Sequence, residues 1–237
     1  MTAKFHCFND TEEMFDGVAE EVTRQLQRAL EKQGIASLIL PGGTTPAPLF
    51  ERLSKTSLNW ENVTCLPSDE RWVDEDHEQS NYRLIKANLL KEQAADATLC
   101  SLKTEEPSPK EAVNTLNERL DDIIKYSACT VLGMGKDGHF ASLFPEAANL
   151  EEGLSFSPTE HCIAIDATGS PVAGDYPHRM SLTLSALLKS QLVIIMITGQ
   201  DKRKVIEEAM SDRTSDYPIT ALLSQSQTPV EIYWTDV

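Results

Sequence analysis

Residues 192–203 read LVIIMITGQDKR, an apolar run that ends at Thr198 and is followed by one glycine and then by polar and charged residues. Seven residues of this kind suit a strand that is buried on both faces, as in a parallel sheet, and are too few for a buried helix. Gly199 allows a sharp turn, and residues 201–210 have the pattern of a helix. We therefore predict a buried strand in the middle of a sheet, joined directly to a helix.

The same succession of apolar strand, turn and amphipathic helix recurs along the chain. Further strands are predicted at residues 35–40, 63–66, 97–102, 129–132, 162–165 and 230–234, and further helices at 10–33, 46–55, 80–90, 108–126 and 182–190. The helix at 108–126 opens with a capping box and a proline at its first position. Alternating strands and helices predict an α/β fold with a mainly parallel sheet flanked by helices on both faces. No long linker divides residues 1–237, so we expect one domain.

In such sheets ligands bind beyond the carboxyl ends of the strands, which directs attention to the strand-to-helix loops. The first of these contains Gly42-Gly43-Thr44-Thr45, and Pro46 opens the next helix with Thr45 placed to cap it. Glycines let the backbone approach a ligand, and free N–H groups at a helix start attract anions. The turn can therefore hold a phosphate, and an ordinary tight turn is the equal alternative, because paired glycines are common.

The loop predicted at 67–79 begins with Ser68, Asp69, Glu70 and Arg71. Arg71 offers the planar donor pair that suits a phosphate, and the two acids can orient it or hold sugar hydroxyl groups. The acids that follow do not have the spacing of a calcium loop or of an HExxH helix. We therefore favour a solvated acidic loop over a metal site.

Residues 133–145 read GMGKDGHFASLFP and follow the strand predicted at 129–132. The glycines require a tightly folded turn, which carries both Asp137 and His139. A histidine titrates near neutral pH and can take a proton from water, while a nearby carboxylate fixes its tautomer. The alternative is a histidine that only satisfies a helix start. Because the glycines, the aspartate and the ligand-binding edge of the sheet coincide, we interpret His139 as a catalytic base.

Two more basic residues are candidate anion ligands. Lys202 stands at the start of the helix after residue 199, and Arg179 precedes the helix predicted at 182–190. An exposed lysine on an amphipathic helix is the alternative for Lys202. The chain has no GxSxG motif and no cysteine beside a glycine-rich turn, so covalent catalysis has little support.

The 237 residues carry 21 Lys+Arg and 37 Asp+Glu, a net charge of −16. This balance, with no basic cluster longer than three residues, argues against nucleic-acid binding. No run approaches the ~20 apolar residues of a membrane span, and the first ten residues do not have the pattern of a secretory signal. We expect a cytoplasmic protein with reduced cysteines. The sequence leaves the oligomeric state open, and we slightly favour a monomer.

Five segments together resemble the 6-phosphogluconolactonase family. They read PGGTTP, SDERWVDEDHEQSNY, LGMGKDGHFASLFP, RMSLTLSALLKS and TGQDKRKVIEEAM, occur in the order of the family and span roughly residues 15–234. The Gly-Gly-Thr-Thr-Pro turn is shared more widely, with glucosamine-6-phosphate deaminases and other sugar-phosphate isomerase-like proteins. Pro41 stands where a small residue is usual, and Phe140 where threonine is usual.

The resemblance implies a modified Rossmann-like fold, no cofactor or metal, and hydrolysis of a phosphorylated sugar lactone, 6-phospho-D-glucono-1,5-lactone. His139 would activate the attacking water with support from Asp137. By position, the resemblance implies Gly43, Thr44, Thr45, Arg71, Lys202 and Arg179 as phosphate ligands. Gly42 of the same turn and Asp69 are further candidate substrate ligands from the residues themselves. Amides of the turn at 133–138 are candidate donors to the oxyanion.

Two other functions remain as alternatives. An amino-sugar phosphate deaminase or isomerase needs an acid/base pair for proton transfer between carbons. The ASLFP ending after His139 argues against it, because deaminases carry an acidic segment there. A sugar-phosphate sensor without activity is the second alternative, but no DNA-binding helix pair or basic region flanks the domain.

Overall fold

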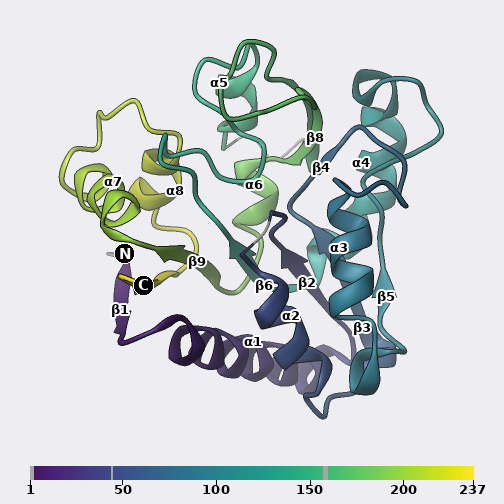
Figure 1. Ribbon diagram of the computed structural model, residues 1–237. Coiled ribbons are helices and arrows are strands. Elements are labelled where there is room, and N and C mark those ends of the chain that lie inside the picture. The colour runs from purple at the N-terminus through teal and green to yellow at the C-terminus, as the bar shows by residue number, and fades with distance from the viewer. Residues whose placement is uncertain (1–2, 44, 157–159) are drawn as a thin grey trace.

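The main sheet has seven parallel strands in the order β1-β10-β9-β6-β2-β3-β5 (Figure 1). The computed structural model describes residues 3–43, 45–156 and 160–237. In chain order the strands are β1 (Lys4–Phe8), β2 (Ala36–Leu40), β3 (Val63–Pro67), β5 (Thr98–Leu99), β6 (Ser127–Leu132), β9 (Val193–Thr198) and β10 (Val230–Thr235). The chain therefore has the α/β architecture with a mainly parallel sheet that the alternating pattern predicts.

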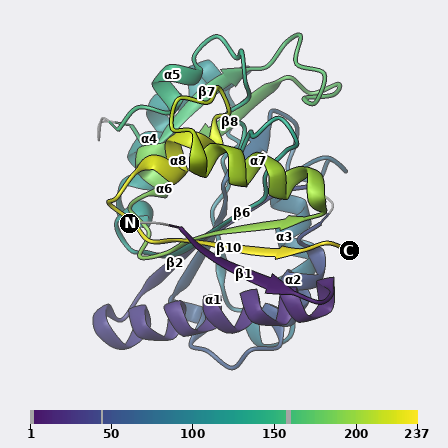
Figure 2. The same cartoon turned by 90° about the vertical axis from the view of Figure 1, so that its left-hand side faces the viewer.

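Helices cover both faces of this sheet (Figure 2). One face is covered by α1 (Thr11–Gln33), α2 (Ala47–Ser54) and α3 (Asn81–Asn88), and the other by α4 (Pro109–Lys125), α6 (Leu184–Leu187), α7 (Gln200–Ser211) and α8 (Ile219–Ser224). Successive residues of a strand point to opposite faces. In β9, Ile194 and Met196 therefore join the apolar cluster under α1, while Ile195 and Ile197 join the cluster under α7.

A second, smaller sheet is antiparallel and lies on the α7 side, at the top of Figure 1. Its strands, in spatial order, are β4 (Asp69–Arg71), β8 (His178–Leu182) and β7 (Cys162–Asp166). Met180 and Leu182 are fully buried and belong to the same apolar cluster as Ile195. The short helix α5 (Leu150–Gly153) stands beside β7. This sheet holds β4 and β8 over the carboxyl ends of the main strands.

The capping signals of the helices predicted at 10–33 and 108–126 are confirmed. Asp10 accepts a hydrogen bond from the Glu13 amide at 2.9 Å, and Gly34 ends α1 with φ 80°, a left-handed conformation that glycine adopts at little cost. Ser108 caps α4 through the amide of Glu111.

Several predicted elements differ in the structure. The helix expected at 182–190 is wrong at its start, because residues 178–182 form β8 and only Leu184–Leu187 is helical. Arg179 therefore lies on a strand. The loop expected at 67–79 contains β4, and the strand at 162–165 pairs antiparallel rather than within the main sheet. The strand expected at 97–102 is reduced to Thr98–Leu99.

Two finer predictions also fail. The apolar run at 192–198 is an inner strand of the sheet, but β6 occupies the middle position. All inner strands are covered on both faces, so apolar character alone does not order them. Pro46 rather than Thr45 occupies the N-cap position of α2, which has no side-chain cap.

Candidate active site

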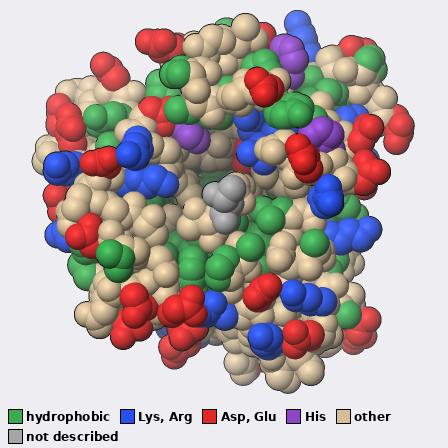
Figure 3. Space-filling view, viewed as in Figure 1, with side chains coloured by type: hydrophobic (Ala, Val, Ile, Leu, Met, Phe, Trp, Pro, Cys, Tyr) green, Lys and Arg blue, Asp and Glu red, His purple; other side chains and the backbone are tan. Residues whose placement is uncertain are grey.

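A cavity of about 290 Å³ opens where β9, β6 and β2, three neighbouring strands, reach their carboxyl ends. β4, β8 and the start of α7 complete its walls. Among the proposed site residues, those that line it are Gly42, Gly43, Thr45, Asp69, Arg71, His139, Arg179 and Lys202. Thr44 lies outside the described residues. The space-filling view has a hollow near the centre of this face with Lys and Arg side chains at its edge (Figure 3).

Asp137 and His139 form a hydrogen-bonded pair in the turn after β6. Nδ1 of His139 lies 2.6 Å from Oδ1 of Asp137. Burial alone would raise the pKa of Asp137, but its hydrogen bonds with His139 and the charge of the ring outweigh burial and lower that pKa. An ionised carboxylate only accepts, so Nδ1 carries a proton, and the neutral form of the ring then has its free lone pair on Nε2. Asp137 itself does not line the cavity.

Gly135 is the glycine on which this pair depends. A Cβ atom at Gly135 would lie 2.3 Å from Nδ1 of His139 and 2.4 Å from Oδ1 of Asp137. Phe144 packs against the ring of His139 with 4.5 Å between centroids. The amides of Gly135 and Gly138 bond to carbonyl groups of His139 and Gly135 within the turn. These two amides are therefore engaged and are removed from the candidate oxyanion donors.

Three cations face the cavity from three different elements. Arg71 of β4 donates from Nη1 to the carbonyl oxygen of Gln79 at 2.9 Å and to Oδ1 of Asn81 at 2.7 Å, which leaves its Nε and Nη2 without a partner among the described residues. Lys202 of α7 has no hydrogen-bonded or ionic partner in the described parts of the chain. Burial and the nearby charge of Lys136 lower the pKa of Lys202. A dianionic ligand would offset both effects.

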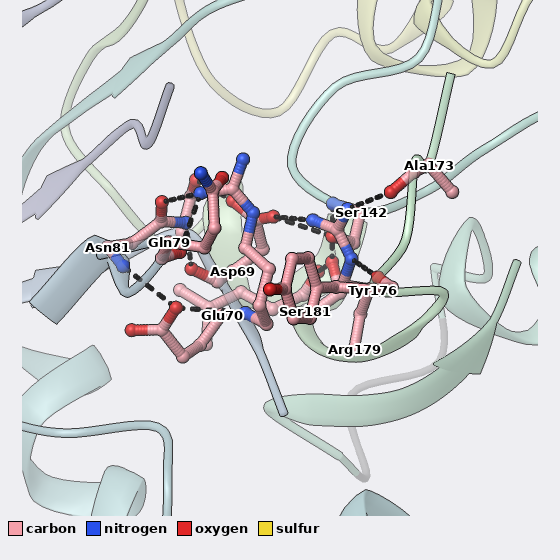
Figure 4. A network of polar contacts seen from close by, with 12 residues as sticks. Asp69, Glu70, Gln79, Asn81, Ser142, Ala173, Tyr176, Arg179 and Ser181 are labelled. Carbon is pink, nitrogen blue, oxygen red and sulfur yellow. Dashed lines mark hydrogen bonds and ion pairs between the residues drawn. The ribbon is translucent and has the colours of Figure 1, made fainter. Parts of the chain in front are cut away.

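The third cation, Arg179 of β8, is buried, and part of its guanidinium group is already hydrogen-bonded within the protein (Figure 4). It donates to the carbonyl oxygens of Tyr176 and Ala173 at 2.5 and 2.8 Å, and its Nη1 lies 3.9 Å from Oδ2 of Asp69. Burial lowers the pKa of Arg179, and the charge of Asp69 opposes this. The residue thus ties the loop before β8 to the wall of the cavity.

Asp69 is held by two serine hydroxyl groups. Ser142 donates to its Oδ2 at 2.5 Å and Ser68 to its Oδ1 at 3.1 Å. The Ser142 amide in turn donates to Oγ of Ser181 on β8 at 3.2 Å. This network connects the turn that carries His139 with β4 and β8, and the motif spacing gave no signal for it.

Glu70 and Asn81 are buried polar residues. Glu70 is expected from the sequence to orient the Arg71 side chain or to hold a sugar hydroxyl group, but it binds backbone amides instead. Glu70 accepts from the amides of Arg71, Asn81 and Tyr82, each at 2.8 Å, and from the hydroxyl of Ser80. Burial raises the pKa of Glu70 to about 7, although these backbone bonds oppose the rise. Asn81 appeared in the sequence only as part of a helix start, and Ser80 does cap α3.

No group of three or more His, Cys, Asp or Glu residues within the described ranges has a geometry that could hold a metal ion. No helix in those ranges is long and apolar enough to cross a membrane. Four of the cysteines are buried and Cys7 is exposed, and all five are free.

Residues 9–234 match the family model described as glucosamine-6-phosphate isomerases/6-phosphogluconolactonase. The chain belongs to this family. It is 34% identical to a 6-phosphogluconolactonase of Rhizobium meliloti over 235 residues, which cover 99% of both chains, and 31% identical to one of Caulobacter vibrioides over 98% of this chain and 97% of the relative. The crystal structure of a 6-phosphogluconolactonase from Shewanella baltica superposes with a TM-score of 0.91 at 33% identity and covers 98% of this chain and 97% of that one.

Proposed function

We propose that this protein hydrolyses 6-phospho-D-glucono-1,5-lactone to 6-phospho-D-gluconate, the lactonase step of the oxidative pentose phosphate pathway, without a cofactor. Family membership and relatives named 6-phosphogluconolactonase support this reaction. The observation that carries it is that His139, hydrogen-bonded to Asp137, faces one cavity together with three cations. A base and a separate anion anchor are what a phosphorylated lactone requires.

In the proposed reaction Nε2 of His139 takes a proton from water as the water oxygen attacks the lactone carbonyl carbon. The tetrahedral intermediate collapses with cleavage of the ring C–O bond, and the imidazolium returns the proton to the departing ring oxygen. Asp137 holds the ring in the required tautomer and stabilises its cationic form. General-base catalysis of this kind contributes roughly 10²–10⁴-fold. The products are a carboxyl group and a free hydroxyl group.

The phosphate end of the substrate is proposed to bind between the turn after β2 and the three cations. Gly42, Gly43 and Thr45 lie on one side, with Arg71, Arg179 and Lys202 on the others, and Asp69 is placed to accept from a sugar hydroxyl group. Thr44 is assigned to this turn from the family resemblance alone. Binding energy at the remote phosphate orients the carbonyl carbon toward His139.

Turnover of the phosphorylated lactone by the purified protein tests the proposal, measured after subtraction of spontaneous hydrolysis. Glucono-1,5-lactone, which lacks the phosphate, serves as the control substrate and should react far more slowly. Release of ammonia from glucosamine 6-phosphate would instead support the deaminase alternative. Tight binding of 6-phospho-D-gluconate with no turnover of the lactone would support the sensor alternative.

A further inference from the structure

Asn81, the first residue of α3, is buried between three elements of the site. It is 1% exposed. Its Oδ1 accepts from Nη1 of Arg71 at 2.7 Å, and its Nδ2 donates to the carbonyl oxygen of Asp69 at 2.7 Å. A Cβ atom at Gly42 would lie 2.1 Å from the same Oδ1, so the amide group packs directly against the turn after β2. One side chain of α3 thus contacts both β4 and the glycine turn.

The chemistry of its partners fixes which way the amide group points. A guanidinium group only donates and a backbone carbonyl only accepts, so Oδ1 must face Arg71 and Nδ2 must face Asp69. Neither an aspartate nor a leucine can satisfy both partners. In the close-up, Asn81 lies beside Gln79, and a dashed line joins it to Glu70 (Figure 4).

The backbones of Asn81 and Arg71 are also joined through Glu70. Both amides donate to the same oxygen, Oε1 of Glu70, at 2.8 Å. The two side chains then meet again at 2.7 Å. These bonds fix the backbone positions of Arg71 and Asn81 as well as the position of the guanidinium group. Nε and Nη2 of the Arg71 side chain have no partner among the described residues and remain available to a ligand.

We propose that Asn81 is the positioning residue of Arg71: it holds one edge of the guanidinium group so that the other edge faces the phosphate of the substrate. The identity of the substrate in this inference rests on the proposed function, but the coupling between Asn81 and Arg71 does not. A preformed guanidinium group does not lose side-chain entropy when the phosphate binds. Any side chain at Gly42 would displace the amide group of Asn81, so a substitution at Gly42 also tests this contact.

A purely structural role for Asn81 predicts a different outcome. If Asn81 only stabilised the start of α3, its loss would lower the melting temperature. In the folded protein, kcat and KM would then change little, and KM would not change selectively. A positioning role predicts a selective loss of phosphate affinity that depends on the presence of Arg71. A double-mutant cycle separates the two.

The cycle uses Asn81→Ala, Arg71→Ala and the double variant, with Asn88→Ala as the matched control. Asn88 lies on the same helix, and its Nδ2 donates to the carbonyl oxygen of Leu84, away from the cavity. We expect Asn81→Ala to raise KM by about tenfold, because a hydrogen bond to a charged group is worth roughly that factor, with a smaller change in kcat. In the Arg71→Ala background the same change should shift KM less than about twofold. Asn88→Ala should leave KM unchanged.

If Asn81→Ala does not fold, Gly42→Ala provides a second route, since it displaces the amide group without removing it. Its effect on KM should shrink in the Arg71→Ala background. Undiminished effects of both variants without Arg71 would overturn the proposal. Titration with inorganic phosphate separates this proposal from the function. If the wild type binds phosphate through Arg71 but does not turn over the lactone, the function fails while the coupling stays measurable.

Discussion

At the scale of single residues, the site depends on positions where no side chain fits. Gly135 leaves just enough room for the bond between Asp137 and His139, and Gly42 does the same for the amide group of Asn81. The sequence could indicate a tight turn that carries a base at residues 133–139, because the glycines and the two-residue separation of Asp137 and His139 are local signals. It could not indicate Asn81 or Ser142, because their partners lie 10 and 73 positions away along the chain.

Gly135→Ala should lower kcat by about 10²-fold or more while binding of inorganic phosphate stays near that of the wild type. The added Cβ would overlap both members of the pair and force the imidazole out of line with its carboxylate. Gly133→Ala, at a residue that also lines the cavity, separates overlap with the pair from the general effect of a methyl group in this turn, since a Cβ atom there meets nothing within 4 Å. Steady-state kinetics of both variants check this. Equal kcat values for the two would contradict the role given to Gly135.

At the scale of secondary-structure elements, the helices and strands that were predicted best contain the sequence signals for their own formation. α1 and α4 have capping residues at their starts, and β2, β6 and β9 are mostly apolar runs with a glycine one or two positions after their ends. β4 is different, because it consists of Asp69, Glu70 and Arg71 and has no apolar residue. Its burial is made possible by the amides of α3 and the hydroxyl groups around it. Such compensation depends on residues from other elements, so β4 reads as a polar loop in the sequence.

The junction of β4 and α3 should make stability depend on pH through Glu70. Its pKa is raised from 4.5 to about 7 in the folded protein. Below about pH 4.5 the carboxyl group is protonated in both states and has no effect. As pH rises toward 7, ionisation favours the unfolded chain, and the loss of stability is complete above that pH.

Urea unfolding at pH 5 and pH 8 of the wild type and Glu70→Gln measures this effect. From pH 5 to pH 8, the free energy of unfolding of the wild type should fall relative to that of the variant, by on the order of 2 kcal/mol. The comparison between the two proteins cancels the contributions of the other acids. Parallel pH profiles would show that Glu70 titrates as an ordinary glutamate.

At the scale of the whole molecule, the two sheets share one apolar core. Ile163 and Met180 of the small sheet belong to the same buried cluster as Ile39 and Ile195 of the main sheet. The cavity lies between the sheets, and residues of both line it. An overall charge of −16 makes the surface unattractive to anions, so anion binding requires the local group of cations in the cavity.

We predict that the chain unfolds as one cooperative unit, because the small sheet cannot leave without exposing the core beneath α7. Far-UV circular dichroism and tryptophan fluorescence should report the same midpoint in urea. Trp60 lies in the core under α1, and Trp72 packs beside the small sheet, so the fluorescence reports on both parts. Two separate transitions would mean that the small sheet folds independently.

The most direct test of the account is the hydrolysis of 6-phospho-D-glucono-1,5-lactone by the wild type and His139→Ala side by side, corrected for spontaneous hydrolysis. If Nε2 of His139 activates the water, the variant should lose about 10²–10⁴-fold in kcat, with KM nearly unchanged because the phosphate contacts remain. A variant that keeps the turnover of the wild type would contradict the assignment of His139 as the base.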